Sequence, residues 1–235
     1  MDRLNVYEAV QKRLKIIFDY FDYVYISFSG GKDSGVLLNL CMDYIRKHAP
    51  ERRLGVFHMD YEAQYRQTTE YVEVFHCCIP FKVSTCTSMF QQYWRPWDDG
   101  CKDIWVRKMP DKCLTYKDFD FFNADLWDYD FQNMFTEWLH RRKKSKRICC
   151  LVGIRTQESF NDIWTANGRF NWDYNRLYDL YHKAGVPISR QRVASPFISQ
   201  AIPMLALYRA IDPDTWGRMV GRVNGIGCAA IYGST

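Results

Sequence analysis

The sequence lacks a long apolar run, and this absence argues against a membrane-spanning protein. No apolar stretch is long enough to cross a bilayer. The N-terminal segment MDRLNVYEAVQKRLK mixes acidic and basic side chains and has none of the apolar core of a secretory signal peptide. We therefore expect a cytoplasmic protein without a membrane segment.

A disulfide scaffold and the common metal-binding spacings are missing as well. The nine cysteines are scattered and odd in number. The adjacent pairs 77–78 and 149–150 have no Cys-x-x-Cys companion, and Cys101 and Cys113 have no histidine nearby. We therefore expect a reducing compartment, with neither an iron–sulfur cluster nor zinc.

A strong excess of either charge is also absent. The 32 basic and 27 acidic side chains give a net charge of +5, which favours an anionic ligand without requiring nucleic acid. One basic run, RRKKSKR at 141–147, follows a predicted helix and contains no aromatic residue. Cations at a helix C-terminus complement the helix dipole, which is the simplest interpretation. Nucleic-acid contact through this run remains an alternative.

What the sequence does contain is a glycine-rich loop between a predicted strand and a predicted helix. Residues 23–28 are β-branched and aromatic, as in a buried strand. Apolar residues then recur at helical spacing from 36 to 45. The segment SGGKDS at 29–34 joins them, so its amide groups precede a helix N-terminus, where anions bind.

Each side chain of this loop suits phosphate. Gly30 and Gly31 permit positive φ and close approach of the backbone. Lys32 adds a mobile positive charge, while Ser29 and Ser34 offer hydroxyl groups.

Asp33 distinguishes the loop from a Walker A motif, which has Ser or Thr after its lysine. A carboxylate beside phosphate needs a cation between them, so Asp33 is a candidate magnesium ligand. The alternative is a Gly-Gly turn with an exposed lysine, in which Asp33 caps the helix.

Strands and helices alternate along the rest of the chain, which predicts an α/β fold with an open parallel sheet. The expected elements are helix 5–20, strand 52–60, helix 62–78, strand 81–87, a helix that contains 131–139, and strand 148–154. The last of these reads as a central strand covered on both faces. Ligands of such sheets bind at the carboxyl ends of the strands.

Two further strand ends carry polar residues. Asp60 ends the second strand and is either a helix cap or a site residue. Gly153 follows the apolar strand and permits close backbone approach. Arg155 offers a planar fork for phosphate or sulfate, and Glu158 can orient it or cap a helix. For Arg155, a surface ion pair is the alternative.

The motif SGGKDS resembles the PP-loop of the N-type ATP pyrophosphatase and phosphoadenosine phosphosulfate (PAPS) reductase superfamily. GIRTQES at 153–159 resembles a Gly-x-Arg-x-x-Glu-Ser signature of the PAPS reductase-like proteins. The resemblance covers nearly the whole chain. It implies a Rossmann-like adenine nucleotide alpha hydrolase fold, an open and mainly parallel twisted sheet with helices on both faces.

The resemblance also implies a site for ATP or a related adenine nucleotide. The implied binding residues are Ser29, Gly30, Gly31, Lys32, Asp33, Ser34, Asp60, Gly153, Arg155, Glu158 and Ser159. Lys32, Asp33 and Arg155 are the implied catalytic residues, and Asp33 and Asp60 would hold magnesium.

The segments WRPWDD and DIWVRKMP resemble the IbrA-type, prophage-associated branch, whose members imply a ParB-like partner protein. We expect a single domain over 1–235, with an aromatic-rich insertion or lid at 93–130. A C-terminal helical extension is expected at 172–235. Within it, WDYN with a downstream LY resembles the region that closes over substrate in PAPS reductase-like folds.

The implied activity is attack of an unidentified acceptor on the α-phosphate of ATP with release of pyrophosphate. A sulfonucleotide reductase is an alternative, but it requires a reactive cysteine in a Glu-Cys-Gly-Leu-His motif. Cys228, in GIGCAAIYG, has no adjacent Glu or His. A non-catalytic nucleotide-binding regulator of prophage or phage-defence functions is the second alternative.

Overall fold

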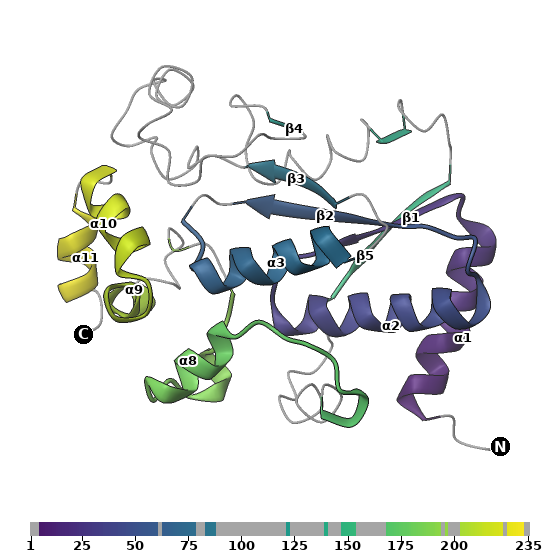
Figure 1. Cartoon of the computed structure of the whole chain (residues 1–235), viewed down its shortest axis with the longest axis horizontal. Helices are drawn as coiled ribbons and strands as arrows, with labels where there is room; N and C mark the ends of the chain where they lie inside the picture. The colour runs from purple at the N-terminus through teal and green to yellow at the C-terminus, as the bar shows by residue number, and fades with distance from the viewer. Residues whose placement is uncertain are drawn as a thin grey trace.

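The structure is a computed structural model in which helices alternate with strands (Figure 1). It describes residues 5–60, 63–78, 83–87, 121–122, 139–140, 147–153, 168–193, 196, 203–222 and 225–232. The main elements are α1 (Val6–Tyr20), β1 (Tyr23–Ser27), α2 (Lys32–His48), β2 (Leu54–Asp60), α3 (Arg66–Cys78), β3 (Val83–Thr87), β4 (Phe121–Phe122), β5 (Ile148–Val152), α8 (Leu177–Lys183), a 3₁₀ helix (Ile188–Arg190), α9 (Leu205–Ile211), α10 (Pro213–Arg222) and α11 (Ile226–Tyr232). Within these ranges, no helix combines the length and apolar character needed to cross a membrane.

The strands of the described chain form one parallel sheet in the order β4-β3-β2-β1-β5. In the register, Val24 of β1 lies opposite Leu54 of β2, and Tyr23 lies opposite Ile148 of β5. The chain therefore adds β2, β3 and β4 on one side of β1 and then returns to add β5 on the other side. The predicted α/β fold with a parallel sheet is confirmed, and its strand order reverses beside β1.

The main core lies between the sheet and helices α1, α2 and α3. It contains Leu14 and Phe18 of α1, Leu38, Cys41, Tyr44 and Ile45 of α2, Tyr71 and Val72 of α3, and Val24, Ile26, Leu54 and Val56 of the sheet. Figure 1 shows α2 and α3 running along one face of the sheet. Tyr25 and Phe57 alternate with these strand residues and are buried as well. Both faces of β1 and β2 are therefore covered.

The last apolar strand differs from its prediction. We expected 148–154 to be a central strand covered on both faces, but among the described strands β5 is the last in the order and pairs with β1. Cys150 and Val152 are exposed. That prediction is wrong, because an apolar run indicates a strand but does not show what covers it.

Helix α1 begins at a capping box, which explains its first residue. The Asn5 side chain accepts a hydrogen bond from the Glu8 amide at 2.9 Å, and the Glu8 carboxylate accepts one from the Asn5 amide at 3.1 Å. Val6, in this first turn, is 82% exposed.

The C-terminal helices form a second core beyond the carboxyl ends of β2 and β3 (Figure 1). The Tyr208 hydroxyl donates to the carbonyl of Ala63 at 2.9 Å. The buried Asp212 carboxylate accepts from the amides of Arg66 at 2.7 Å and Thr215 at 3.1 Å, so it caps both α3 and α10. These helices are thus tied to the segment that follows β2. The division into an insertion at 93–130 and an extension at 172–235 stays a prediction, and apart from β4 the insertion lies outside the described residues.

Candidate functional site

The glycine-rich loop leads from the end of β1 to the first turn of α2, as the sequence predicted. Its first residues are fixed by β2. The Phe28 amide donates to the Phe57 carbonyl at 2.7 Å, and Nδ1 of the buried His58 donates to the Phe28 carbonyl at 2.7 Å. The loop therefore starts from a rigid strand end.

Gly30 needs to be a glycine for two reasons. Its φ is +74°, a value that residues with a side chain rarely adopt. A Cβ atom there would also lie 2.9 Å from Cγ2 of Thr68. Gly31, by contrast, has φ −86° and is the N-cap of α2. Of the two glycines, Gly30 is the one that adopts the predicted positive φ.

The two serines of the loop close it from within. Their hydroxyl oxygens, Oγ of Ser29 and Oγ of Ser34, lie 3.0 Å apart. The Ser29 hydroxyl accepts from the Gly31 amide at 3.2 Å, and the Ser34 hydroxyl donates to the Gly31 carbonyl at 3.1 Å. The Gly31 amide therefore donates to a hydroxyl oxygen within the loop, with the kind of bond that it could make to a phosphate oxygen.

Lys32 is buried, with 8% of its surface exposed. Its amide donates to the hydroxyl of Tyr178 at 3.1 Å, and its Nζ lies 5.7 Å from the centre of the Tyr178 ring. The prediction of a mobile charge is wrong, because this cation is held against an aromatic ring inside the protein. Asp33 follows in the first turn of α2, where the positive end of the helix favours a carboxylate.

A cavity of about 320 Å³ opens at this loop. It is lined by Ser27, Ser29, Gly31, Lys32, Asp33 and Ser34, by Val152 and Gly153 after β5, and by Tyr178, Gln191, Arg192 and Val193. It lies at the carboxyl ends of β1 and β5, the two neighbouring strands between which the strand order reverses. Parallel sheets bind ligands at this position.

Gly153 brings the third predicted segment to the loop. A Cβ atom on Gly153 would lie 2.9 Å from the Ser34 amide nitrogen and 3.0 Å from the Asp33 carbonyl carbon. These are backbone atoms, so no side chain could move to make room. The close approach seen here is to the first turn of α2, and approach of the Gly153 backbone to a ligand stays a prediction.

The remaining predicted residues are only partly described. Asp60 is the last residue of β2, and its side chain lies outside the described part. Arg155, Glu158 and Ser159 lie outside the described residues, as does the basic run 141–146. Among the described residues, no group of three or more His, Cys, Asp or Glu side chains could hold a metal ion. A magnesium site at Asp33 and Asp60 therefore stays a prediction.

Asn175, just before α8, and Tyr178, within it, also contribute to the site. Neither is among the binding residues that the sequence motifs implied. The Asn175 amide donates to the Gly30 carbonyl and to the Thr68 hydroxyl, each at 2.9 Å. Burial raises the pKa of Tyr178 to about 12, so its phenol is neutral at physiological pH. The resemblance of WDYN to a region that closes over substrate was the one sequence signal for these residues.

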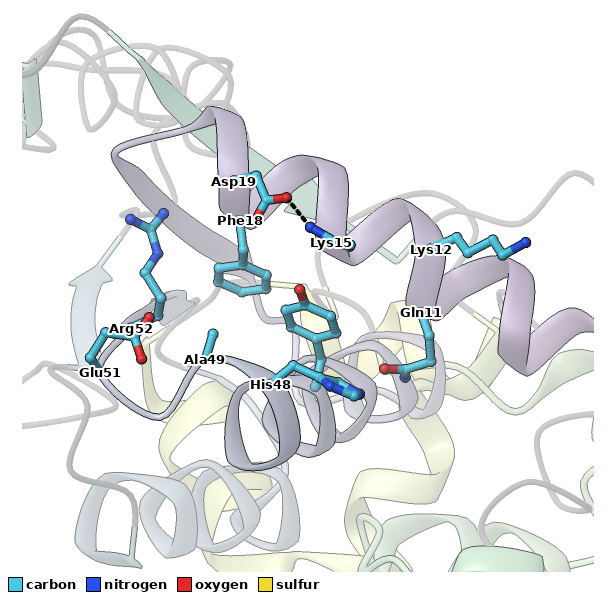
Figure 2. A pocket seen from close by; sticks show the side chains of 10 residues that line it. Gln11, Lys12, Lys15, Phe18, Asp19, His48, Ala49, Glu51 and Arg52 are labelled. Carbon is cyan, nitrogen blue, oxygen red and sulfur yellow. Dashed lines mark hydrogen bonds and ion pairs between the residues drawn. The ribbon is translucent and has the colours of Figure 1, made fainter.

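A second cavity, of about 440 Å³, lies between α1 and the C-terminal part of α2 (Figure 2). Its inner wall is formed by Phe18 and Tyr44, whose rings stack 5.4 Å apart. Its rim carries cations and anions together, among them the ion-paired Lys15 and Asp19. Sequence reasoning did not identify this cavity.

Comparison with known proteins finds similarity along different parts of the chain. Residues 185–235 match the family model DUF3440, a domain of unknown function. The uncharacterized protein YbdN of Escherichia coli (strain K12) is 28% identical over 282 residues, which cover 97% of this chain and 68% of YbdN.

Two solved structures are similar at 14% identity. PAPS reductase from Candida auris, in a phosphate complex, has a TM-score of 0.45, with 72% of this chain and 83% of that chain covered. The U34-tRNA thiolase NcsA from Methanococcus maripaludis has a TM-score of 0.34, with 96% and 80% covered.

The comparison with NcsA contradicts one expectation. That structure contains a [4Fe-4S] cluster, so the expectation that a chain of this kind has no iron–sulfur cluster was wrong. The expectation rested on the spacing of cysteines along the sequence. Spacing is a poor guide, because residues far apart in sequence can meet in the fold.

Proposed function

We propose that this chain binds ATP or a related adenine nucleotide in the 320 Å³ cavity and cleaves it at the α-phosphate with release of pyrophosphate. One observation carries the proposal: a buried lysine, a tight glycine turn and the N-terminus of α2 meet at the carboxyl ends of β1 and β5. Amide groups at a helix N-terminus and a nearby ammonium group bind polyanions such as pyrophosphate. In this proposal the chain is a nucleotide-using member of the PP-loop and PAPS reductase-like superfamily.

The chemistry is transfer at phosphorus. The acceptor forms a bond to the α-phosphorus while the bond to the bridging oxygen breaks, and pyrophosphate leaves with the electron pair. Lys32 neutralises the negative charge that develops on the leaving group. Asp33 lines the same cavity, and Arg155, two residues beyond Gly153, supplies a second cation for phosphate.

The rival reaction, sulfonucleotide reduction, needs a thiol at the nucleotide. None of the cysteines whose side chains the structure describes lines the cavity, and Cys228 is an exposed residue of α11. Sulfonucleotide reduction stays the alternative. The prophage-associated branch, a ParB-like partner and a cytoplasmic location stay predictions.

The test is product analysis after incubation with ATP, with and without added divalent cations. With water as the acceptor, the proposal predicts AMP and pyrophosphate by mass spectrometry, and no product from an ATP analogue with a methylene group between the α- and β-phosphates. Formation of ADP would contradict cleavage at the α-phosphate. Calorimetry with the analogue separates binding from turnover, and absence of binding would contradict the nucleotide site itself.

A further inference from the structure

The segment that opens α8 contacts the phosphate-binding loop at two points, although about 145 residues separate them in sequence. Asn175 reaches the Gly30 carbonyl, and Tyr178 reaches the Lys32 amide. Both side chains are almost fully buried, at 1% and 2% exposed. The loop is therefore held from outside as well as by its own serines.

Asn175 uses its whole amide group in this contact. Its Nδ2 donates to the Gly30 carbonyl and to the Thr68 hydroxyl of α3, and its Oδ1 accepts from the Leu177 amide at 2.9 Å. One side chain thus connects the loop, α3 and the first turn of α8. Such a satisfied buried network holds its members in one geometry.

The Gly30 carbonyl matters because of the peptide group to which it belongs. The carbonyl of Gly30 and the amide of Gly31 are parts of one planar trans peptide and point in opposite directions. A hydrogen bond that fixes the carbonyl toward Asn175 therefore fixes the amide toward Ser29, which lines the cavity. Because neither flanking residue has a Cβ atom, the backbone itself opposes a flip of this peptide only weakly, and the hydrogen bonds at its two ends hold it in place.

Tyr178 acts on the next residue. Its hydroxyl accepts from the Lys32 amide, and its ring lies 5.7 Å from Lys32 Nζ. Backbone and side chain of the lysine are thus both in contact with one aromatic residue. Because Tyr178 also lines the cavity, it holds the ammonium group beside the space for the anion.

We propose that Asn175 and Tyr178 are positioning residues of the phosphate-binding loop. Asn175 prevents a flip of the peptide between Gly30 and Gly31, and Tyr178 holds Lys32 beside the cavity. This inference rests on the proposed function, since it assigns roles at the same site. It assigns neither residue a direct step in the reaction.

The chain offers a matched control in Tyr181. This residue lies one turn further along α8, is also 2% exposed, and donates a hydrogen bond to the Arg192 carbonyl at 3.4 Å. It does not line the cavity. Its ring contacts that of Tyr178, and its hydrogen-bond partner Arg192 lines the cavity. Removing its hydroxyl therefore tests the loss of one buried hydrogen bond of α8 while the contacts of Asn175 and Tyr178 with the loop stay in place.

The experiment is calorimetric titration of the full chain with inorganic pyrophosphate, together with thermal unfolding. In Asn175→Asp the donor to the Gly30 carbonyl becomes an acceptor, so we expect an affinity loss of about tenfold or more. Tyr178→Phe keeps the ring and loses one acceptor, so we expect a loss of about threefold to tenfold. Tyr181→Phe should bind within about twofold of wild type.

Two further readouts separate positioning from simple destabilisation. A carboxyl placed at this buried position should be protonated more readily than in water, and protonation restores a donor, so the affinity of Asn175→Asp relative to wild type at the same pH should rise as pH falls. The Gly31 amide resonance in nitrogen-labelled protein should shift in Asn175→Asp and not in Tyr181→Phe. A structural role alone would lower the melting temperature without either effect.

The outcomes distinguish this inference from the proposed function. If wild-type protein does not bind pyrophosphate, the proposed function fails first. If wild type binds and folded Asn175→Asp and Tyr178→Phe bind equally well, the positioning roles are wrong. If Asn175→Asp fails to fold, Thr68→Val takes its place, because it removes one hydrogen-bond partner of Asn175 and keeps the side-chain shape. Its affinity for pyrophosphate should be about twofold to fivefold lower than that of wild type. Wild-type affinity in that variant would count against the role of Asn175.

Discussion

The two ends of helix α2 each border a cavity, and the smaller cavity is the better candidate site. At the C-terminal end, about 440 Å³ lie between α1 and α2, and the polar groups of the rim are exposed side chains such as Lys15 and Asp19. At the N-terminal end, about 320 Å³ are bordered by strand ends, a tight turn and the buried Lys32. Convergence of fixed backbone groups with a buried cation, rather than volume, identifies the site.

The helix itself makes the two ends different. Its N-terminus carries partial positive charge and its C-terminus partial negative charge. Arg46, Lys47 and His48 occupy the last turn, where cations compensate the dipole. At the first turn the compensating negative charge is Asp33 together with the proposed phosphates. An anion bound at the first turn therefore gains from the helix, while one bound at the last turn does not.

The largest expected effect is at Lys32. Lys32→Ala should lower ATP turnover by about 10²-fold or more, because it removes a preorganised charge at the leaving group. The matched change at the other end, Lys15→Ala, should leave turnover unchanged. Steady-state pyrophosphate release measures the turnover of both variants. Full activity of Lys32→Ala would contradict a catalytic site at the N-terminal end of α2.

Gly153→Ala should weaken pyrophosphate binding by about tenfold or more. The added methyl group would press on backbone atoms of Asp33 and Ser34, and such overpacking typically costs about 1–3 kcal/mol. Gly217→Ala in α10 is the control, since a Cβ atom there meets nothing within 4 Å. It should bind normally and be stabilised by up to about 1 kcal/mol. Equal binding by both variants in calorimetry would show that the close approach at Gly153 is unimportant.

Alkaline pH should act on the loop end through Tyr178. Burial raises its pKa from 10.0 to about 12, so the folded state favours the neutral phenol. The stability from this shift is complete below about pH 10 and is lost as pH rises through about 12, at up to about 1.4 kcal/mol per pH unit. Urea unfolding between pH 8 and pH 11 gives the free energy of unfolding of wild type and of Tyr178→Phe. The wild-type value should fall relative to that of Tyr178→Phe above about pH 10. A constant difference would contradict the shifted pKa.

The smallest expected effect is at the exposed ion pair of the larger cavity. Asp19→Ala should change the free energy of unfolding by less than about 0.5 kcal/mol, because both partners are well exposed. Pyrophosphate affinity should stay as in wild type. A clear loss of affinity would indicate that the α1–α2 cavity takes part in ligand binding.

The sequence predicted those parts of the fold and the site that depend on local patterns. Helix 5–20 corresponds to α1, and the loop 29–34 lies between β1 and α2 as expected. Apolar periodicity and glycine chemistry are short-range signals, so they can be read from one segment. The expected helix at 62–78 begins only at Arg66, because helix ends depend on capping contacts such as that with Asp212.

The parts that were missed depend on contacts between distant segments. Asn175 and Tyr178 reach the loop across about 145 residues, and no local pattern shows which backbone groups they contact. The position of β5 at the end of the described sheet was missed for the same reason, since its apolar residues are the same in a central strand or an edge strand. The burial of Lys32 depends on the Tyr178 ring as well.

Amide resonances followed during titration with ATP test the central claim most directly, because they report on both ends of α2 at once. Binding at the loop should shift the amides of residues 30–34 and of Gly153, and leave those of residues 11–19 and 48–52 unchanged. Shifts confined to the second group would contradict the account, since the ligand would then occupy the larger cavity at the other end of the helix.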